Sequence, residues 1–431
     1  MAKPGKIQVG IVGLGTVGGG TLQLLQQNQA LLKARTGLEF RVSRAADIDP
    51  ARGAPFPAVK FTTAYADILN DPGIQIVVET VGGTGEPAFS VIRDSLAAGK
   101  HVVTANKALL AEKGEPLFKL AQEKGVGLYF EAAVCGGIPI IRSLQEGLLA
   151  NRITKIIGIL NGTCNYILTR MRTGRKTFGE ALHDAQQAGF AEADPTLDIS
   201  GMDTAHKLSL LCTLAWGIAV HPERIPRVGI SEVNAEDIWF AQEIGYRIRL
   251  LALARRAGNS LSIQVHPTMV PQESMMGAVE EEFNAVAVLG DFCDSIFFSG
   301  KGAGSRPTAS SVVADIVAAG RGLATAAPLR VYRPEEAEEI SLTKNVTAAY
   351  YLRLKVLDRP GVLGKISTVL GQHQVSISRV VQHAITAAGE ATVIIITHQC
   401  ENRRLQRAGE EINGLDILKE KMITIQIEDA V

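Results

Sequence analysis

The feature that most constrains the fold is a glycine pattern directly after an apolar segment near the start of the chain. Residues 6–12, KIQVGIV, are typical of a buried parallel strand, because their apolar residues do not alternate cleanly with polar ones. The next six residues match GxGxxG: Gly13, Leu14, Gly15, Thr16, Val17 and Gly18. Residues 17–35 then have helical composition. A GxGxxG between a strand and a helix predicts a turn that binds the pyrophosphate of a dinucleotide, in an α/β domain.

Length and composition set the class of protein. With 431 residues, 46% of them apolar, the chain exceeds one ordinary core and is predicted to form two or three domains. Its 44 basic and 44 acidic residues cancel, which argues against nucleic acid or an anionic membrane as the main partner. No apolar run reaches the length of a membrane span and no signal peptide is recognised, so a cytoplasmic protein is expected. The scattered cysteines are typical of reduced thiols: Cys135, Cys164, Cys212, Cys293 and Cys400.

Charged residues near the end of the second predicted strand bear on the choice of dinucleotide. Residues 39–46 are predicted to form this strand, and Asp47 follows it. An acid at this place bonds the adenosine ribose and favours NAD. Arg44 and Arg52 lie close by and favour the extra phosphate of NADP, so both cofactors stay open.

Polar residues after the next two strands are further candidates for the cofactor cleft. Strands are predicted at residues 74–78 and 101–105, and ligands of such sheets bind at the carboxyl ends of the strands. Thr80, Asn106 and Lys107 are therefore expected beside the cofactor. The alternative for Lys107 is a solvated residue at the start of a helix.

A second glycine-rich loop leaves the strand predicted at residues 127–132. Oxygen atoms in this loop can surround a hard monovalent cation, because such ions prefer oxygen ligands. The candidate ligands are the carboxylate of Glu131 and the carbonyls of Val134, Gly136 and Ile138. Cys135 is an alternative candidate here, as a thiol nucleophile for an aldehyde, although no nearby motif supplies a base to activate it.

Acidic residues crowd the segment 189–207, GFAEADPTLDISGMDTAHK. Asp203 and Lys207 stand at i and i+4 on a predicted helix, so the carboxylate can hold the ammonium. Glu192 and Asp198 precede that helix in a turn-rich stretch that is predicted as a loop. The functional hypothesis is a pocket in which a lysine, fixed by an aspartate, meets a small amino-acid-like substrate. The alternative is an ordinary ion pair on a solvated helix.

The rest of the chain predicts a sheet domain and a separate tail. Apolar or alternating runs predict a mostly antiparallel sheet, at residues 153–160, 246–254, 261–270 and 285–289. Gly302 precedes a small-residue helix predicted through Ala319, and it suits close approach to the cofactor or to a packed strand. From Tyr351 the order of strand, helix, strand, strand, helix and strand predicts a ferredoxin-like unit.

Six segments of the chain together resemble one family. They are GLGTVG at 13–18, VTANKALLA at 103–111, AAVCGGIPII at 132–141, NGTCNYIL at 161–168, GFAEADPTLDISGMDTAHK at 189–207 and GKGAGSRPTASSVV at 300–313. Over nearly its whole length the sequence resembles the bacterial homoserine dehydrogenases that carry a C-terminal ACT regulatory domain. The resemblance implies reduction of L-aspartate 4-semialdehyde to L-homoserine with NADH or NADPH, on the route to threonine and methionine.

The resemblance also implies roles for particular residues. Lys207 is expected to donate the proton, Asp203 to orient it, and Lys107 to lie between cofactor and substrate. Glu192 is expected to bind the amino group of the substrate, and Asp198 and Lys207 are also expected to contact the substrate. A sodium site is expected at Glu131, Val134, Gly136 and Ile138. Ala46 stands where many relatives carry a basic residue for the phosphate of NADP, which favours NAD.

The resemblance implies four parts. Residues 1–150 are expected to form the NAD(P)-binding Rossmann domain, completed by a returning segment near 300–330. Residues 151–320 are expected to form an α+β substrate-binding and dimerisation domain, 321–348 a linker, and 349–431 the ACT domain. Threonine is the expected effector of the ACT domain, and a homodimer or homotetramer is the expected assembly.

Two other functions are weighed against this one. A phosphorylating semialdehyde dehydrogenase would oxidise the same aldehyde through a thiohemiacetal on Cys135, but His101 and His183 show no activating motif. A metabolite sensor would only bind its ligands, and the pairing of Asp203 with Lys207 beside an acidic segment argues against it.

Overall fold

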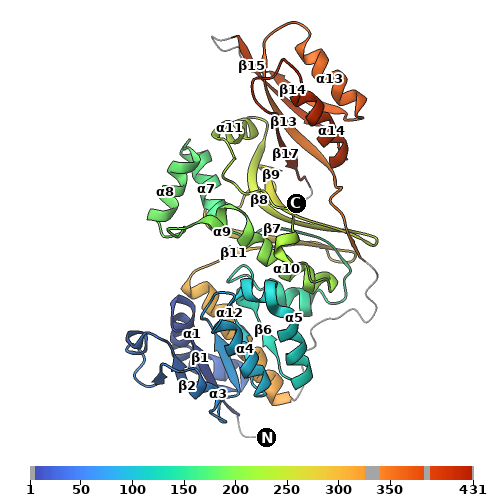
Figure 1. Cartoon of the computed structure of the whole chain (residues 1–431). Coiled ribbons are helices and arrows are strands. Elements are labelled where there is room, and N and C mark those ends of the chain that lie inside the picture. The colour runs from blue at the N-terminus through green and yellow to red at the C-terminus, as the bar shows by residue number, and fades with distance from the viewer. Residues whose placement is uncertain (1–4, 326–339, 383–388, 430–431) are drawn as a thin grey trace. The chain divides into compact units, whose positions relative to one another are not determined.

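The computed structural model describes residues 5–325, 340–382 and 389–429. The chain divides into two compact units, whose elements are labelled in Figure 1. The first draws on residues 1–162, 202–225 and 282–338. The second draws on residues 163–201, 226–281 and 339–431. Each unit therefore combines segments that lie far apart in the sequence.

A six-stranded parallel sheet organises the first unit. Its strands are β1 (Lys6–Val12), β2 (Glu39–Ala46), β3 (Lys60–Thr62), β4 (Ile76–Glu79), β5 (His101–Thr104) and β6 (Leu128–Tyr129). The order across the sheet is β3-β2-β1-β4-β5-β6, which is the order of a Rossmann fold. The predicted Rossmann-type domain is confirmed, and the ligand cleft of such a sheet lies where the order reverses, beyond β1 and β4.

Helices complete this unit. They are α1 (Thr16–Gln27), α2 (Gln29–Thr36), α3 (Ala66–Leu69), α4 (Ala88–Ala97), α5 (Lys107–Lys124), α6 (Ile140–Arg142), α10 (Met202–Trp216) and α12 (Ser305–Thr325). The helix predicted at residues 17–35 is two helices, because the chain leaves helical geometry at Asn28.

Helix α12 belongs to the core of the parallel sheet although it lies late in the chain. Its residues Val312 and Ile316 are buried in one cluster with Ile7 and Val9 of β1. Gly20 of α1 permits close packing, since a β-carbon there would lie 2.4 Å from the hydroxyl oxygen of Ser305. The sheet core is therefore built from both ends of the first unit.

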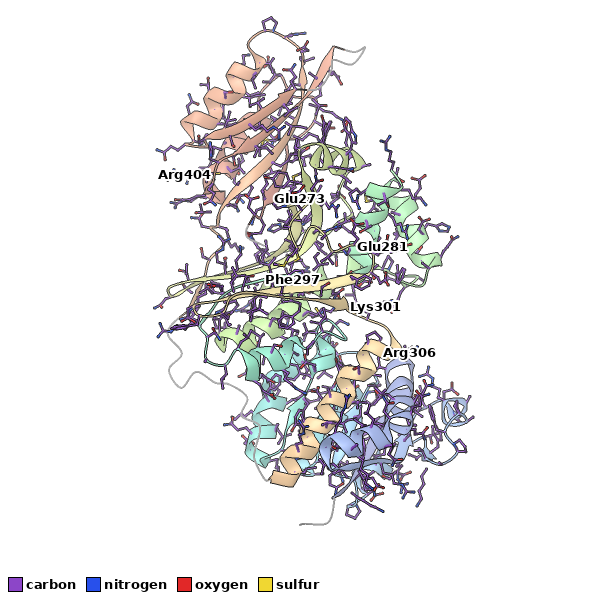
Figure 2. All side chains as sticks on the ribbon, turned by 180° about the vertical axis from the view of Figure 1, so that it is seen from behind. Glu273, Glu281, Phe297, Lys301, Arg306 and Arg404 are labelled. Carbon is purple, nitrogen blue, oxygen red and sulfur yellow. The ribbon has the colours of Figure 1, made fainter. Side chains whose placement is uncertain are left out.

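Three antiparallel strands also belong to the first unit: β7 (Ile153–Ile159), β10 (Phe283–Gly290) and β11 (Asp294–Lys301). No strand was predicted at β11, because DSIFFSGK holds only three consecutive apolar residues and no clear alternation. Figure 2 shows Phe297 and Lys301 on this strand and Arg306 at the start of α12. The intervening glycines thus carry the chain from the antiparallel strands back to the Rossmann core.

The second unit joins a long hairpin to a ferredoxin-like sheet. Its strands are β8 (Tyr246–Ala257), β9 (Ser260–Pro271), β12 (Ser341–Leu342), β13 (Thr347–Leu357), β14 (Ile377–Gln382), β15 (Glu390–Thr397), β16 (Cys400–Glu401) and β17 (Ile423–Ile427). The order is β8-β9-β17-β13-β15-β14. Its helices are α7 (Gly162–Thr173), which starts at the last residue of the first unit, α8 (Phe178–Gln187), α9 (Thr196–Ile199), α11 (Ala235–Glu243), α13 (Val362–Gln372) and α14 (Asn402–Asn413).

The carboxyl-terminal part has the predicted βαββαβ order, with β16 as a short addition. Figure 1 shows α13 and α14 on one side of its sheet. Its last strand, β17, pairs in parallel with β9, so that Gln426 lies opposite Thr268. The ferredoxin-like sheet is thereby hydrogen-bonded to the hairpin of β8 and β9.

A buried ion pair adds to this connection. Arg353 of β13 donates to Asp237 of α11 through Nε at 2.7 Å and through Nη2 at 3.1 Å. The hydroxyl of Tyr351 donates to the same carboxylate at 3.1 Å. The two charged side chains are only 3% and 2% exposed, so Asp237 depends on Arg353 for its counter-charge. Arg353 also pairs through Nη1 with Glu420 at 2.6 Å and with Glu236 at 3.3 Å.

Two predicted irregular segments contain regular structure. The acidic segment was predicted as a loop, but Asp198 lies in the one-turn helix α9. In the segment predicted as a linker, α12 continues to Thr325 and β12 pairs with β9, while residues 326–339 lie outside the described residues. Among the residues that the structure describes, no helix is long and apolar enough to cross a membrane.

Candidate active site

A lysine and an aspartate lie buried on one face of α10. The Nζ atom of Lys207 is 2.7 Å from Oδ2 of Asp203, one helical turn earlier. Both residues are less than a tenth exposed. Asp203 stands in the first turn of the helix, where the free backbone N–H groups favour a negative charge. The i, i+4 spacing thus gives a fixed ammonium rather than a solvated surface pair.

The turn between β7 and α7 holds this pair from the other side. Lys207 donates from Nζ to the carbonyl oxygen of Leu160 at 2.6 Å, and Asn161 donates from Nδ2 to Oδ2 of Asp203 at 2.8 Å. No role was predicted for Leu160 or Asn161. Their place directly after a strand, in a motif that resembles the family, was the one available signal.

Lys107 brings a second ammonium to the same carboxylate. Its Nζ lies 3.3 Å from Oδ1 of Asp203, and its side chain is 38% exposed. Lys107 is the first residue of α5, and Asn106 caps that helix by accepting from the N–H of Leu109. The structure therefore brings together Lys107, Asp203 and Lys207, the three predicted catalytic residues.

These three groups determine the charge of the site. Burial alone raises the pKa of Asp203, but Lys207 and then Lys107 outweigh it and hold the pKa well below the ordinary value. Asp203 is thus ionised at neutral pH. Two ammonium groups against one carboxylate leave a local charge of +1, which favours an oxygen atom that gains negative charge.

The glycine loop after β1 has the form of a pyrophosphate site. Gly13 has φ 92°, a left-handed backbone conformation that glycine adopts without strain. A β-carbon on Gly18 would lie 1.9 Å from the carbonyl oxygen of Gly13. Helix α1 begins at Thr16, directly after the loop. The loop and the helix start therefore fit the phosphates of a dinucleotide.

Two side chains stabilise the loops around this site. Thr80 donates its hydroxyl to the carbonyl oxygen of Gly13 at 2.7 Å. Glu79 is fully buried and accepts from the N–H of Val81 at 2.7 Å and from the hydroxyl of Thr104 at 2.6 Å. Burial raises the pKa of Glu79. Thr80, predicted to contact the cofactor, thus holds the glycine loop, and Glu79 holds the segment after β4.

The predicted cation loop is tied by backbone hydrogen bonds. The carboxylate of Glu131 accepts from the N–H groups of Ile141 and Arg142, both at 2.8 Å. The carbonyl of Gly136 accepts from Ser311 at 2.6 Å, and that of Ile138 accepts from the N–H of Ile140 at 2.8 Å. Each of these carbonyl oxygens accepts one hydrogen bond and has a second lone pair. Among the described residues, no three His, Cys, Asp or Glu side chains form a metal cluster.

Cys135 lies in the same loop and is fully buried. Burial raises the pKa of its thiol to about 11, so the thiolate is scarce at neutral pH. Its φ of 55° is uncommon for a residue other than glycine. The neighbouring Gly136 packs against Gly302, since a β-carbon on Gly136 would lie 2.5 Å from the carbonyl oxygen of Gly302. The thiol thus has the chemistry of a structural cysteine rather than of a nucleophile.

Glu192 and Asp198, the predicted substrate ligands, belong to the second unit. Glu192 is exposed, and its backbone carbonyl accepts from the side chain of Gln186 at 3.2 Å. Asp198 is partly buried, and its carbonyl accepts from the thiol of Cys164 at 3.2 Å. Thr163 donates to the carbonyl of Phe190 at 2.7 Å, which fixes the start of the acidic segment on α7.

Comparisons with known proteins agree on one family. Residues 13–131 match the model of the homoserine dehydrogenase NAD-binding domain, residues 139–317 that of homoserine dehydrogenase, and residues 350–416 that of the ACT domain. The chain is 39% identical to the homoserine dehydrogenase of Neisseria gonorrhoeae, over 98% of both chains.

Solved structures give the same result. The crystal structure of a homoserine dehydrogenase from Thiobacillus denitrificans is 44% identical, with a TM-score of 0.94 over 100% of both chains. A hyperthermophilic archaeal homoserine dehydrogenase in complex with NADPH is 26% identical, with a TM-score of 0.63, covering 76% of this chain and all of its own. The chain therefore belongs to the homoserine dehydrogenase family of NAD(P)-dependent oxidoreductases that act on a CH–OH group, and it carries a C-terminal ACT domain.

Proposed function

We propose that Lys207, oriented by Asp203, is the proton donor in the reduction of L-aspartate 4-semialdehyde to L-homoserine. The observation that carries this proposal is the buried ammonium of Lys207, held at 2.7 Å from Asp203 and 2.6 Å from the carbonyl of Leu160. A general acid must be fixed in place and charged before the reaction begins. This lysine meets both requirements.

The dinucleotide supplies a hydride to the aldehyde carbon when bound. Lys207 stabilises the charge that develops on the aldehyde oxygen and then gives it a proton. Asp203 keeps that ammonium in one position, and Asn161 keeps Asp203 in place by its hydrogen bond at 2.8 Å. Lys107 adds a second positive charge, 3.3 Å from the same aspartate, between the cofactor side and the substrate side.

Binding of the substrate is assigned to the acidic segment. Glu192 takes the α-amino group, because a carboxylate attracts the ammonium of an amino acid, and Asp198 is proposed as a further substrate contact. The exposed position of Glu192 supports this role, since its charge is available to a ligand. On the cofactor side, the glycine loop is proposed as the phosphate site and Thr80 as its support. Asp47 is proposed as a ribose contact, and Gly302 as a close-packed turn beside the cofactor.

A sodium ion is proposed at the oxygen atoms of Glu131, Val134, Gly136 and Ile138. The buried carbonyls of this loop support the proposal, because a carbonyl that accepts one hydrogen bond retains a lone pair for a cation. The ion would fix the loop that carries Cys135 and contacts Gly302.

The ACT domain is proposed to bind threonine and to regulate turnover. The strand pairing between β17 and β9 supports a mechanical connection from the regulatory sheet to the hairpin of β8 and β9. The proposed NAD(P)-binding domain comprises residues 1–150 and a returning segment near 300–330. The proposed substrate-binding and dimerisation domain comprises 151–320, the linker 321–348 and the ACT domain 349–431. A homodimer or homotetramer is the proposed assembly.

The test is steady-state reduction of L-aspartate 4-semialdehyde with NADH and with NADPH, each with and without threonine. Turnover with either cofactor and its loss in Lys207→Met support the catalytic proposal. Turnover that survives in Lys207→Met would overturn it. Inhibition by threonine supports the effector, and an unchanged rate at saturating threonine rejects it.

A further inference from the structure

The carboxylate of Asp47 accepts hydrogen bonds from two backbone N–H groups. Its Oδ2 accepts from the N–H of Leu14 at 2.6 Å, and its Oδ1 accepts from the N–H of Asp49 at 3.0 Å. The residue is only 8% exposed. Burial raises the pKa of Asp47, but the bonds from Asp49 and Leu14, together with the charge and hydrogen bond of Arg52, outweigh burial, so the pKa is lowered. Both carboxylate oxygens therefore hold the backbone, one at the glycine loop and the other in the turn after β2.

Arg52 extends over the same loop. Its Nη1 lies 3.3 Å from Oδ2 of Asp47, and its Nε lies 3.7 Å from Oδ2 of Asp49. The same Nη1 would lie 3.4 Å from a β-carbon on Gly15, the residue that caps helix α1. Half of the side chain is exposed. The guanidinium is thus above the phosphate loop and accessible to a ligand.

Arg44, the other basic residue of this region, points elsewhere. Its Nη2 lies 3.6 Å from Oδ2 of Asp71, and its side chain is 25% exposed. Arg44 lies within β2, two residues before the end of that strand at Ala46. Nothing in the sequence favoured one of these two arginines over the other for the phosphate of NADP. In the structure their surroundings differ, and of the two only Arg52 lies against the glycine loop.

We propose that Arg52 binds the 2′-phosphate of NADPH and makes this enzyme use NADPH in preference to NADH. The inference rests on the proposed dehydrogenase function and adds the cofactor preference to it. A guanidinium can donate two parallel N–H bonds to the oxygens of a phosphate. The 2′-hydroxyl that NADH carries in place of this phosphate offers only one oxygen and no charge.

The exposure of Arg52 makes this exchange of partners feasible. Its contacts with Asp47 and Asp49 are long, at 3.3 and 3.7 Å, and its own guanidinium is half exposed, so Arg52 can exchange these partners for a phosphate at little cost. Asp47 keeps its backbone donors when Arg52 turns to the phosphate, so the loop retains its shape.

The test uses Arg52→Gln, with Arg44→Gln as the matched control. Binding of adenosine 2′,5′-bisphosphate and of AMP is measured by titration calorimetry, alongside NADP⁺ and NAD⁺. Arg52→Gln is expected to weaken the bisphosphate and NADP⁺ by about tenfold or more, the loss of one charge-assisted pair. Binding of AMP and NAD⁺ is expected to stay within about twofold in both variants, because neither ligand carries a 2′-phosphate.

Arg52→Lys provides a second variant that keeps the charge. It is expected to restore part of the NADP⁺ affinity, because an ammonium binds phosphate without the bidentate geometry. Equal losses for AMP and bisphosphate in Arg52→Gln would overturn the proposal, as would a larger loss in Arg44→Gln. These affinities do not depend on turnover. If the dehydrogenase function itself were wrong, the protein would not reduce the aldehyde but would still bind the bisphosphate and AMP with different affinities.

Discussion

Asp203 and Lys207 lie one turn apart on a single helix and form a buried ion pair whose oxygen and nitrogen are 2.7 Å apart. Because the pair is buried, its stability depends on the correct charge on both residues. Asn161 and Lys107 contact the same carboxylate from separate elements. One aspartate thus joins β7, α5 and α10 at the site.

The charge of Asp203 predicts how stability depends on pH. Its pKa in the folded state is below the ordinary value of 3.8, so its stabilisation is present above about pH 4 and is lost as pH falls below it. Asp203→Asn removes this dependence and leaves two ammonium groups without their carboxylate. We expect a loss of about 3 kcal/mol at pH 7 for the variant.

The measurement is urea unfolding of both proteins from pH 7 to pH 3. The difference in unfolding free energy between them is expected to shrink below about pH 4, by at most about 1.4 kcal/mol per pH unit. A difference that stays constant over this range would show that Asp203 is not held in its ionised form.

Cys135 predicts an experiment that separates reduction from thiol chemistry. With a thiol pKa of about 11 and no exposed surface, it should resist iodoacetamide at pH 8 in the folded protein. Cys135→Ser is expected to keep turnover within about threefold of the original, because the proposed reaction uses no thiol. Loss of turnover with unchanged folding would support the thiohemiacetal route instead.

The glycine loop predicts different effects at two neighbouring positions of α1. A β-carbon on Gly18 would lie 1.9 Å from the carbonyl oxygen of Gly13, whereas a β-carbon on Gly19 would lie 3.4 Å from the carbonyl oxygen of Leu14. Gly18→Ala should therefore weaken cofactor binding by about tenfold or more, since the loop must open. Gly19→Ala should leave binding unchanged and stabilise the helix by up to about 1 kcal/mol. Calorimetric titration with NADP⁺ compares the two, and equal affinities would contradict the assigned loop geometry.

Asp237 and Arg353 predict a large effect on stability within the second unit. Arg353→Met leaves the buried carboxylate of Asp237 without its cation and should cost about 3–5 kcal/mol. Asp237→Asn should cost less, about 1–3 kcal/mol, because Arg353 keeps its ion pairs with Glu420 at 2.6 Å and Glu236 at 3.3 Å. The double variant should lose less than the sum of the two, because neither charge is then stranded.

The exposed pair of Lys365 and Asp416, 4.0 Å apart, provides the control on the ferredoxin-like part. Lys365→Gln is expected to change the unfolding free energy by less than about 0.5 kcal/mol. Chemical denaturation of all four variants makes the comparison. Additive losses in the double variant would mean that Asp237 and Arg353 stabilise the fold independently.

The elements with simple patterns could be predicted from the sequence. β1 and β2 have the predicted bounds: β1 is a mostly apolar segment that ends before Gly13, and β2 ends before Asp47. The pairing of Asp203 with Lys207 followed from helical spacing alone. The ferredoxin-like order followed from alternating strands and helices.

Other features depend on contacts between distant segments, and no local pattern encodes them. Asn161 reaches Asp203 across 42 positions, and Arg353 reaches Asp237 across 116. The one-turn helix that contains Asp198 is too short to show a period, and β11 has too few apolar residues to alternate. Arg44 and Arg52 looked equivalent in the sequence, because their directions depend on which acid each meets in the fold.

The most direct test of the central claim compares the original protein with Lys207→Met in the reduction of L-aspartate 4-semialdehyde, together with cofactor affinity. The expected result is turnover in the original, a fall of about 10²–10⁴ in kcat for the variant, and an unchanged Kd for NADP⁺. Such a result would place Lys207 in the chemical step. A variant that keeps its kcat would contradict the assignment of Lys207 as the proton donor.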